Sequence, residues 1–205
     1  MVLKVMTVSI EATSKKYHGR KAATYEAVRK KQKRWHRENE LVEKFLGHNP
    51  GRVLDVPVGT GRFLWLYERS GATVVDGIDI SEEMLALASA KLKHLWVRST
   101  RLTLKKGDAR NIECANHYYT TSVCIRFLDL IDETAMRAVM HELFRVTKKQ
   151  IVLTIRFGQK YLPKSNTAEH DKQKFRQMVR RAGWKITRAE PIRNAGWHVI
   201  KLERM

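Results

Sequence analysis

Short apolar runs that are typical of buried strands alternate with amphipathic helical patterns along most of this chain. The alternation begins with the run RVLDVPV at residues 52–58 and continues with TVVDGIDI at residues 73–80. A strand that follows a strand and a helix normally returns parallel to the first strand, with the helix packed on the sheet. The pattern therefore predicts an α/β protein with a mostly parallel sheet and helices on both faces.

Five further segments carry strand patterns, at residues 102–104, 120–127, 151–157, 185–191 and 197–202. Helical patterns occupy residues 22–46, 63–69, a segment that Ser81 can cap, 133–147 and 168–182. The last two strands are separated only by a turn, so we expect one antiparallel strand at an edge of the sheet. We predict a three-layer sandwich around a mostly parallel seven-stranded sheet whose last strand is antiparallel.

Length and composition limit the domain organisation. At 205 residues, 43% of them hydrophobic, the chain can bury one sizeable core, so we predict one domain at residues 22–205 after a loose basic segment at 1–21. The two cysteines, Cys114 and Cys124, lie far apart and without metal-ligand spacing, which indicates neither a disulfide framework nor a metal site. No eighteen-residue apolar run and no signal-type segment occurs, so we expect a cytoplasmic protein with no membrane partner.

The segment VLDVPVGTGRFL, at residues 53–64, places an acid inside an apolar run and then two glycines one residue apart. Parallel sheets bind ligands beyond the carboxyl ends of their strands, and glycine lets the backbone approach a ligand closely. A dinucleotide-binding turn needs a third glycine, where this chain has Leu64. An unpaired carboxylate in a strand is costly, so Asp55 indicates a ligand with a cationic group.

These residues resemble the first motif of the class I S-adenosylmethionine-dependent methyltransferases, in the form D-x-P-x-G-T-G-R. Three later segments are similar to further motifs of that family: VDGIDIS at 75–81, KGDARNI at 106–112 and SVCIRFLDLID at 122–132. Asp79 follows Gly61 by eighteen residues, and this spacing carries much of the resemblance. The chain departs from the family in the NHYYTT segment, at residues 116–121, where an acid and an aromatic residue are usual.

The resemblance implies S-adenosylmethionine as the cofactor and a methyl transfer to an unassigned acceptor. Asp79 would accept the ribose hydroxyls, Ile80 would pack on the adenine, and Asp108 with the Ala109 backbone would recognise the adenine edge. The implied cofactor-binding residues are Asp55, Pro57, Gly59, Thr60, Gly61, Asp79, Ile80, Asp108, Ala109 and Cys124. The acceptor site would be lined by Tyr25, Arg126 and Phe127. On this interpretation a branched side chain at Gly61 would abolish binding and leave the fold intact.

Simpler roles stay open for several of these residues. The two glycines can form an ordinary tight turn, Asp79 can prepare the cap at Ser81, and Cys124 can be a core thiol. Methyl transfer depends mainly on alignment, so no catalytic residue is assigned. A general base is needed only if the acceptor must lose a proton, and the candidates would be His18, Tyr25, His117 and His170.

The charge is strongly positive, with 40 Lys and Arg against 21 Asp and Glu, a formal net charge of +19. Basic residues gather between Lys15 and Arg37, where Glu26 is the one acid before Arg37, and again between Arg156 and Arg181. Two basic segments beside one cofactor mouth would suit the phosphates of a nucleic acid, and a solvated basic surface is the simpler alternative. We therefore keep three hypotheses: a nucleic-acid methyltransferase, a small-molecule methyltransferase, and a non-catalytic cofactor-binding or structural module.

Overall fold

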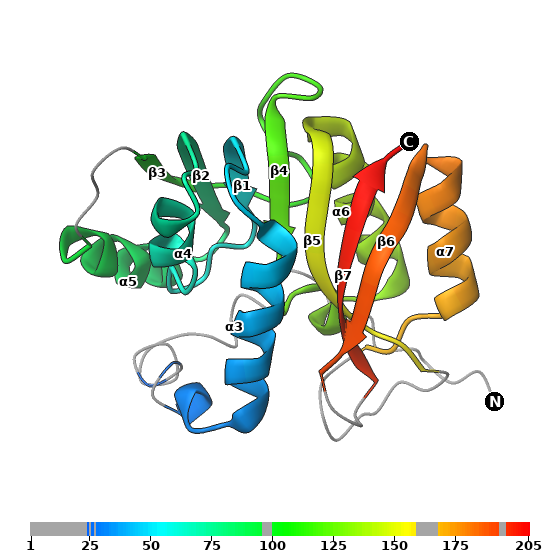
Figure 1. Ribbon diagram of the computed structural model, residues 1–205, viewed down its shortest axis with the longest axis horizontal. Coiled ribbons are helices and arrows are strands. Elements are labelled where there is room, and N and C mark those ends of the chain that lie inside the picture. Colours follow the sequence, from blue (N-terminus) through cyan, green and yellow to red (C-terminus); the bar gives the residue numbers. More distant parts are fainter. Residues whose placement is uncertain (1–23, 25, 27, 96–99, 159–167, 193–195) are drawn as a thin grey trace.

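The structure is a computed structural model that describes residues 24, 26, 28–95, 100–158, 168–192 and 196–205. Among these residues the centre is a seven-stranded sheet in the order β3-β2-β1-β4-β5-β7-β6 (Figure 1). The strands are β1 (Arg52–Asp55), β2 (Val74–Asp79), β3 (Arg101–Lys106), β4 (Tyr119–Cys124), β5 (Thr147–Arg156), β6 (Trp184–Pro191) and β7 (Trp197–Arg204). Strands β1 to β5 pair in parallel, and β7 pairs antiparallel with both β5 and β6. The predicted fold class and antiparallel last strand are confirmed.

The expected position of the antiparallel strand is wrong. We placed it at an edge, but β7 lies between β5 and β6, so β6 is the edge strand. Burial explains this order, because Val199, Ile200 and Leu202 of β7 are fully or almost fully buried. Strand β6 exposes Lys185 and Arg188, and charged side chains suit an edge because they oppose pairing with a further strand.

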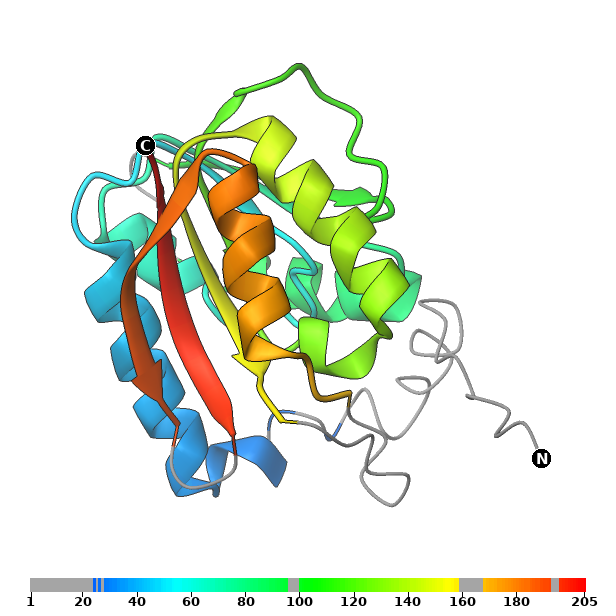
Figure 2. The same ribbon diagram turned by 90° about the vertical axis from the view of Figure 1, so that its right-hand side faces the viewer.

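Helices cover both faces of the sheet, as Figure 2 shows. They are α3 (Lys33–Leu46), α4 (Leu64–Arg69), α5 (Glu82–Lys93), α6 (Glu133–Val146) and α7 (Lys172–Arg181), with a short 3-10 helix η1 (Leu128–Leu130) after β4. Apolar residues of α3 and α4 form one core with the sheet, with α5 packed against it. Those of α6 and α7 form a second core on the opposite face.

Helix α3 is shorter than the helix predicted at residues 22–46. Residues 28–30 are helical, Lys31 and Gln32 form a turn, and α3 begins at Lys33. Like charges four positions apart destabilise a helix, and Arg29 with Lys33 and Lys30 with Arg34 are such pairs. Beyond the turn α3 buries one apolar face, which includes Trp35, Val42, Phe45 and Leu46.

The remaining helices follow their sequence signals. Ser81 caps α5, its hydroxyl accepting a hydrogen bond from the Met84 backbone N–H at 3.3 Å. Helix α6 buries an apolar stripe: Met136, Val139, Met140, Leu143 and Phe144. In α7, Phe175 and Val179 point into the core, and Asp171 caps the helix. These helices fix the positions of the strand ends, and therefore the position of the site.

Candidate active site

A cavity opens at the carboxyl ends of the first four strands in sequence. Asp55 ends β1, Asp79 ends β2, Gly107 follows β3, and Ile125 follows β4, and all four line the cavity. Its empty space is about 950 Å³, a figure that includes open solvent at the mouth. The sheet order reverses direction between β1 and β4, and this switch point is where α/β sheets bind ligands.

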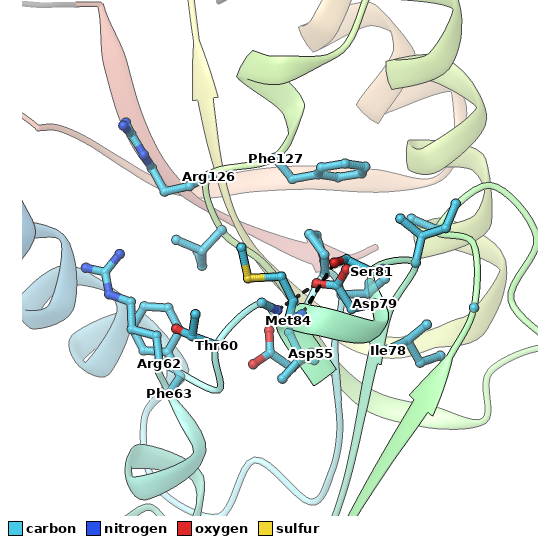
Figure 3. Close-up of a pocket in the computed structure, with 18 of the residues that line it drawn as sticks. Asp55, Thr60, Arg62, Phe63, Ile78, Asp79, Ser81, Met84, Arg126 and Phe127 are labelled. Atoms are coloured by element: carbon cyan, nitrogen blue, oxygen red, sulfur yellow. Dashed lines mark hydrogen bonds between the residues drawn. The ribbon is translucent and has the colours of Figure 1, made fainter. Parts of the chain in front are cut away.

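The turn after β1 is held against the end of β2 by one carboxylate. Asp79 Oδ2 accepts a hydrogen bond from the Gly59 backbone N–H at 2.8 Å, and Oδ1 accepts one from the Ser81 N–H at 2.9 Å (Figure 3). Burial raises the pKa of Asp79, and these backbone donors partly oppose that shift. The simpler role expected for Asp79, fixing the start of α5, is therefore present alongside its place in the cavity wall.

Asp55 is the buried acid of the first motif. Its side chain is almost fully buried at the cavity wall, and its Oδ2 has no hydrogen-bond partner among the described residues. Burial raises its pKa to about 8, and the negative charge of Asp79 adds to the shift, while the Tyr67 hydroxyl and Arg62 oppose it. A cationic group that enters the cavity would favour the ionised form of Asp55 and could then pair with it.

The two glycines of the motif differ in what they face. Gly59 has a φ of 54° and lines the cavity, and a Cβ built on it meets nothing within 4 Å. Gly61 has a φ of 70° and does not line the cavity. A Cβ there would stand 2.7 Å from Leu64 Cδ1 and 3.2 Å from Ala88 Cβ. Close packing against α4 and α5, and not an approach to the cavity, accounts for Gly61.

The structure brings most of the other predicted cofactor residues to the cavity. Its wall includes Asp55, Pro57, Gly59, Thr60, Asp79, Ile80 and Ala109. Asp108 is not among the residues that line the cavity, and it pairs with Arg110 at 2.6 Å. Cys124 is fully buried in the core, where burial raises the pKa of its thiol. Their roles toward a cofactor stay predictions.

The loop after β3 is fastened to α6. The Ile112 backbone N–H donates to Glu142 at 2.8 Å, and Arg145 donates to the carbonyl oxygens of Ile112 at 2.7 Å and Cys114 at 2.8 Å. Arg145 also pairs with Glu142. This network holds the loop, so that Gly107 and Ala109 form part of the cavity wall.

Several lining residues were not predicted from the sequence: Val56, Val58, Arg62, Phe63, Ile78, Ser81, Met84, Gly107, Ile125 and Leu130. Most are apolar or next to a predicted residue. Arg62 had a usable signal, because it is the last residue of the D-x-P-x-G-T-G-R form. Met84 had none, because one apolar residue in the first turn of a helix does not reveal that it faces a ligand site.

The predicted acceptor-site residues Arg126 and Phe127 both line the cavity. Figure 3 shows Arg126 and Arg62 on the same side of it, away from Asp79 and Ser81. The nearly buried Glu38 of α3 binds Arg62 at 2.5 Å and lies 3.8 Å from Arg126. Tyr25, the third predicted residue, lies outside the described residues.

The chain before α3 reaches the glycine turn. Glu26 accepts a hydrogen bond from the Thr60 hydroxyl at 2.5 Å and also pairs with Lys91 of α5. Burial raises the pKa of Glu26, but Lys91 and Thr60 lower it by more, so the pKa lies below its ordinary value.

Of the candidate bases, His18 lies outside the described residues, and neither His117 nor His170 lines the cavity. The ring of His170 is buried and bonds the Leu128 carbonyl oxygen at 2.7 Å.

The helices of the two basic segments, α3 and α7, lie on opposite faces of the sheet (Figure 2). Residues of the two segments nevertheless meet at Trp197, because Arg34 and Arg156 lie 5.5 Å and 4.6 Å from the centre of its ring. Arg156 is nearly buried and pairs with Glu169 at 2.9 Å. Residues 15–23, 25, 27 and 159–167 of these segments lie outside the described residues.

Within the part of the chain that the structure describes, no cluster of metal-ligating side chains occurs. In that same part, no helix is both long and apolar enough to cross a membrane.

Comparison with known proteins links this geometry to one family. Residues 53–150 match the family model described as a methyltransferase domain. A phosphatidylethanolamine N-methyltransferase from Cereibacter sphaeroides is 34% identical over 110 residues, which cover 53% of this chain and 52% of the relative. The chain thus spans about half the length of the curated relative it matches.

Solved structures share the fold at low sequence identity. Magnesium protoporphyrin IX methyltransferase from Synechocystis PCC 6803, with bound SAH, has a TM-score of 0.64 and 17% identity, and the match covers 80% of this chain and 78% of that one. A chain from the complex of a methyltransferase activator with a putative methyltransferase of Haloferax volcanii has a TM-score of 0.69 and 14% identity. That match covers 89% of this chain and 95% of the other. At these identities the likeness shows the fold alone.

Proposed function

We propose that this chain, whose residues 53–150 form a domain of the class I methyltransferase family, is an S-adenosylmethionine-dependent methyltransferase that acts on a small-molecule acceptor. The observation that carries the proposal is the cavity at the switch point, where the Gly59 turn, Asp79 and Asp55 meet. Residues of the matching motifs also form much of the cavity wall.

The residues present fit this cofactor. The open space beside Gly59 admits a ligand against the backbone, and the unpartnered Oδ2 of Asp55 offers an acceptor for a cationic ammonium group. Asp79 stands at the end of β2, where it would accept ribose hydroxyls, and Ile80 and Met84 supply apolar surface. The cofactor supplies an already activated methyl group, so the protein's task is to bind, align and exclude water.

A small-molecule acceptor is favoured over a nucleic acid by the comparison with curated proteins. The relative from Cereibacter sphaeroides is named for a lipid with an amine acceptor, and this supports testing amine acceptors first. The acceptor would enter beside Arg126 and Phe127.

Calorimetry with S-adenosylhomocysteine tests cofactor binding. Asp79→Asn should weaken binding by about tenfold or more, because a hydrogen bond to a charged group contributes roughly 1.5 to 3 kcal/mol. The matched control is Glu82→Gln, since Glu82 is exposed and pairs only at the surface with Lys106 at 2.7 Å. Absence of binding to the wild type would refute the proposal.

Labelled S-adenosylmethionine then tests transfer. Phosphatidylethanolamine vesicles, free phosphoethanolamine and RNA are offered in parallel, and the label should move to a small acceptor or lipid and not to RNA. Binding of the cofactor with no transfer to any acceptor would favour the non-catalytic hypothesis. Transfer to RNA would show that the acceptor class proposed here is wrong.

A further inference from the structure

A second hollow lies outside the candidate active site, between helix α7 and the last two strands of the sheet. Residues of α7, β6 and β7 line most of it. Its empty space is about 1120 Å³, a figure that includes open solvent at the mouth. None of its lining residues lines the cavity at the strand ends, so the two are separate surfaces.

This hollow is lined by four cations and by no acid. Lys172, Arg176 and Arg180 belong to α7, and Lys185 belongs to β6; we call the hollow that they line the basic groove. All four side chains are exposed. Residues four positions apart share one face of a helix, so the three cations of α7 form a row along about 12 Å of that helix.

The cations of the basic groove have no carboxylate partner among the described residues. The acids nearest to them in sequence are engaged elsewhere. Asp171 Oδ1 accepts a hydrogen bond from the Lys174 backbone N–H at 2.8 Å and caps α7. Glu190 of β6 pairs with Arg37 and with Lys44, each at 2.9 Å. The positive charge of the groove is therefore not neutralised within the described part of the chain.

Apart from His198, the rest of the groove lining is apolar and includes Val179, Ile186 and Ile200. At one end of it the Phe157 ring is already packed, with its centre 5.6 Å from that of Phe175 and 5.4 Å from that of His198. An apolar strip bordered by cations suits a partner that is itself both apolar and anionic.

The charge of the chain disfavours its own segments and a second copy as the occupant. Outside the described residues the sequence carries one acid, Glu11. A second copy brings a formal net charge of +19, which repels the cations of the groove. The occupant that fits is a separate, anionic molecule.

Shape and chemistry favour an acidic protein segment among such molecules. A ligand with one charged head group would use only part of the row on α7, and a flat lipid surface does not enter a groove. Single-stranded nucleic acid stacks its bases on aromatic rings, but the Phe157 ring is packed within the protein. An amphipathic helix with acids four positions apart presents charges at the spacing of the α7 row, with apolar side chains beside them.

We propose that the basic groove docks an acidic amphipathic segment of a separate protein. Carboxylates of the partner would pair with the row on α7 and with Lys185, and its apolar side chains would cover the apolar lining. Exposed ion pairs contribute little energy each, but they speed association and select the sign of the partner's charge. The proposal is independent of the proposed function, because this surface lies outside the cavity and needs no cofactor.

Fluorescence anisotropy with a labelled synthetic peptide tests the proposal. The probe is a helical peptide with Glu at every fourth position and Leu on the adjoining face, titrated with the whole chain. The wild type should bind it, and more weakly as salt rises, because exposed charges are screened. Two matched peptides, with Gln in place of Glu or with Ala in place of Leu, should each bind about tenfold more weakly or worse.

Variants of α7 locate the binding. The triple variant Lys172→Gln, Arg176→Gln, Arg180→Gln keeps helix propensity and should lower the affinity for the Glu peptide about tenfold. A matched control removes three exposed charges outside the groove and should change the affinity little: Lys93→Gln, Lys148→Gln, Lys149→Gln. Equal affinity of the wild type and the α7 variant would overturn the proposal, as would equal binding of the Gln peptide.

Ala189 of β6 tests contact inside the groove. It is exposed and lines the groove, so Ala189→Glu should leave the fold intact and repel the Glu peptide. Ala189→Gln adds similar bulk without charge and should weaken binding less. Equal affinity of these two variants would contradict a docking site at the groove. Tighter binding of single-stranded RNA or of anionic vesicles than of the peptide, lost in the α7 variant, would show that the class of partner proposed here is wrong.

Discussion

Asp55 is a buried acid whose raised pKa gives cofactor binding a defined pH dependence. Its pKa is raised to about 8, mainly by burial, so the carboxyl group is largely protonated near neutral pH in the free protein. Only the ionised form can pair with the ammonium group of the cofactor. The proton must therefore leave when the cofactor binds.

We predict that affinity for S-adenosylhomocysteine rises with pH until about pH 8, approaching about tenfold per pH unit well below that value. Above it the affinity should level, because Asp55 is then ionised in the free protein as well. Calorimetry in buffers of different ionisation enthalpy should detect proton release in the wild type and not in Asp55→Asn. A pH-independent affinity would show that Asp55 does not pair with the ligand.

The same pKa has a consequence for the free protein. The folded state holds a proton on Asp55 that the unfolded chain releases above about pH 4, so the stabilising effect of this proton is lost as pH rises from about 4 to about 8. Asp55→Asn should remove this part of the pH dependence of unfolding. This change of stability with pH has the opposite sign to that of an acid in an ion pair, whose contribution to stability is lost as pH falls.

Gly61 should matter for stability more than for binding. Gly61→Ala adds a Cβ 2.7 Å from Leu64 Cδ1 and 3.2 Å from Ala88 Cβ, at a φ of 70°, and should lower the free energy of unfolding by about 1–3 kcal/mol. Gly59→Ala carries similar backbone strain at a φ of 54° but meets no such contact, so it should lower the free energy of unfolding less than Gly61→Ala and weaken S-adenosylhomocysteine binding more. Urea unfolding and calorimetry on both variants distinguish the two effects. Equal loss of affinity in the two would contradict this assignment and restore a ligand role for Gly61.

Helix α3 is attached to the cavity by a residue that lies just before α4. Arg62 donates to Glu38 at 2.5 Å, to Asn39 Oδ1 at 2.9 Å and to the Trp35 carbonyl oxygen at 3.0 Å. The side chains of both Arg62 and Glu38 are mostly buried. The position of the cavity wall at Arg62 therefore depends on this attachment as well as on the strand ends.

Replacing Arg62 should be much more costly than replacing a surface arginine that makes a similar pair. Arg62→Ala leaves Glu38 buried without its main partner, and we expect a loss of about 3–5 kcal/mol in the free energy of unfolding. Arg69→Ala breaks an exposed pair with Glu43, also between α3 and the α4 region, and should cost about 0–1 kcal/mol. Urea unfolding of the two variants gives the comparison. Similar losses would mean that the Arg62 pair is not what attaches α3.

At the scale of the whole molecule, one cavity collects residues from four strand ends that are far apart in sequence. It lies where the strand order reverses, with the two cores on either side of the sheet. Among the described residues, the basic side chains of α3 and α7 lie on opposite faces of the sheet, and Arg62 and Arg126 line the cavity. The fold therefore places positive charge at the cavity as well as over the surface.

The sequence by itself determined the fold class, most strand and helix positions, and seven of the predicted cofactor residues that line the cavity: Asp55, Pro57, Gly59, Thr60, Asp79, Ile80 and Ala109. It could do so because strand periodicity, helix caps and the motif turn are local signals. The tertiary structure alone decided that Gly61 packs against Ala88, that β7 lies inside the sheet, and that α3 and α7 face opposite sides. It alone brought Arg29, Arg34, Arg62 and Arg126 together. These facts depend on contacts between distant segments, and no local pattern of residues encodes which segments will meet.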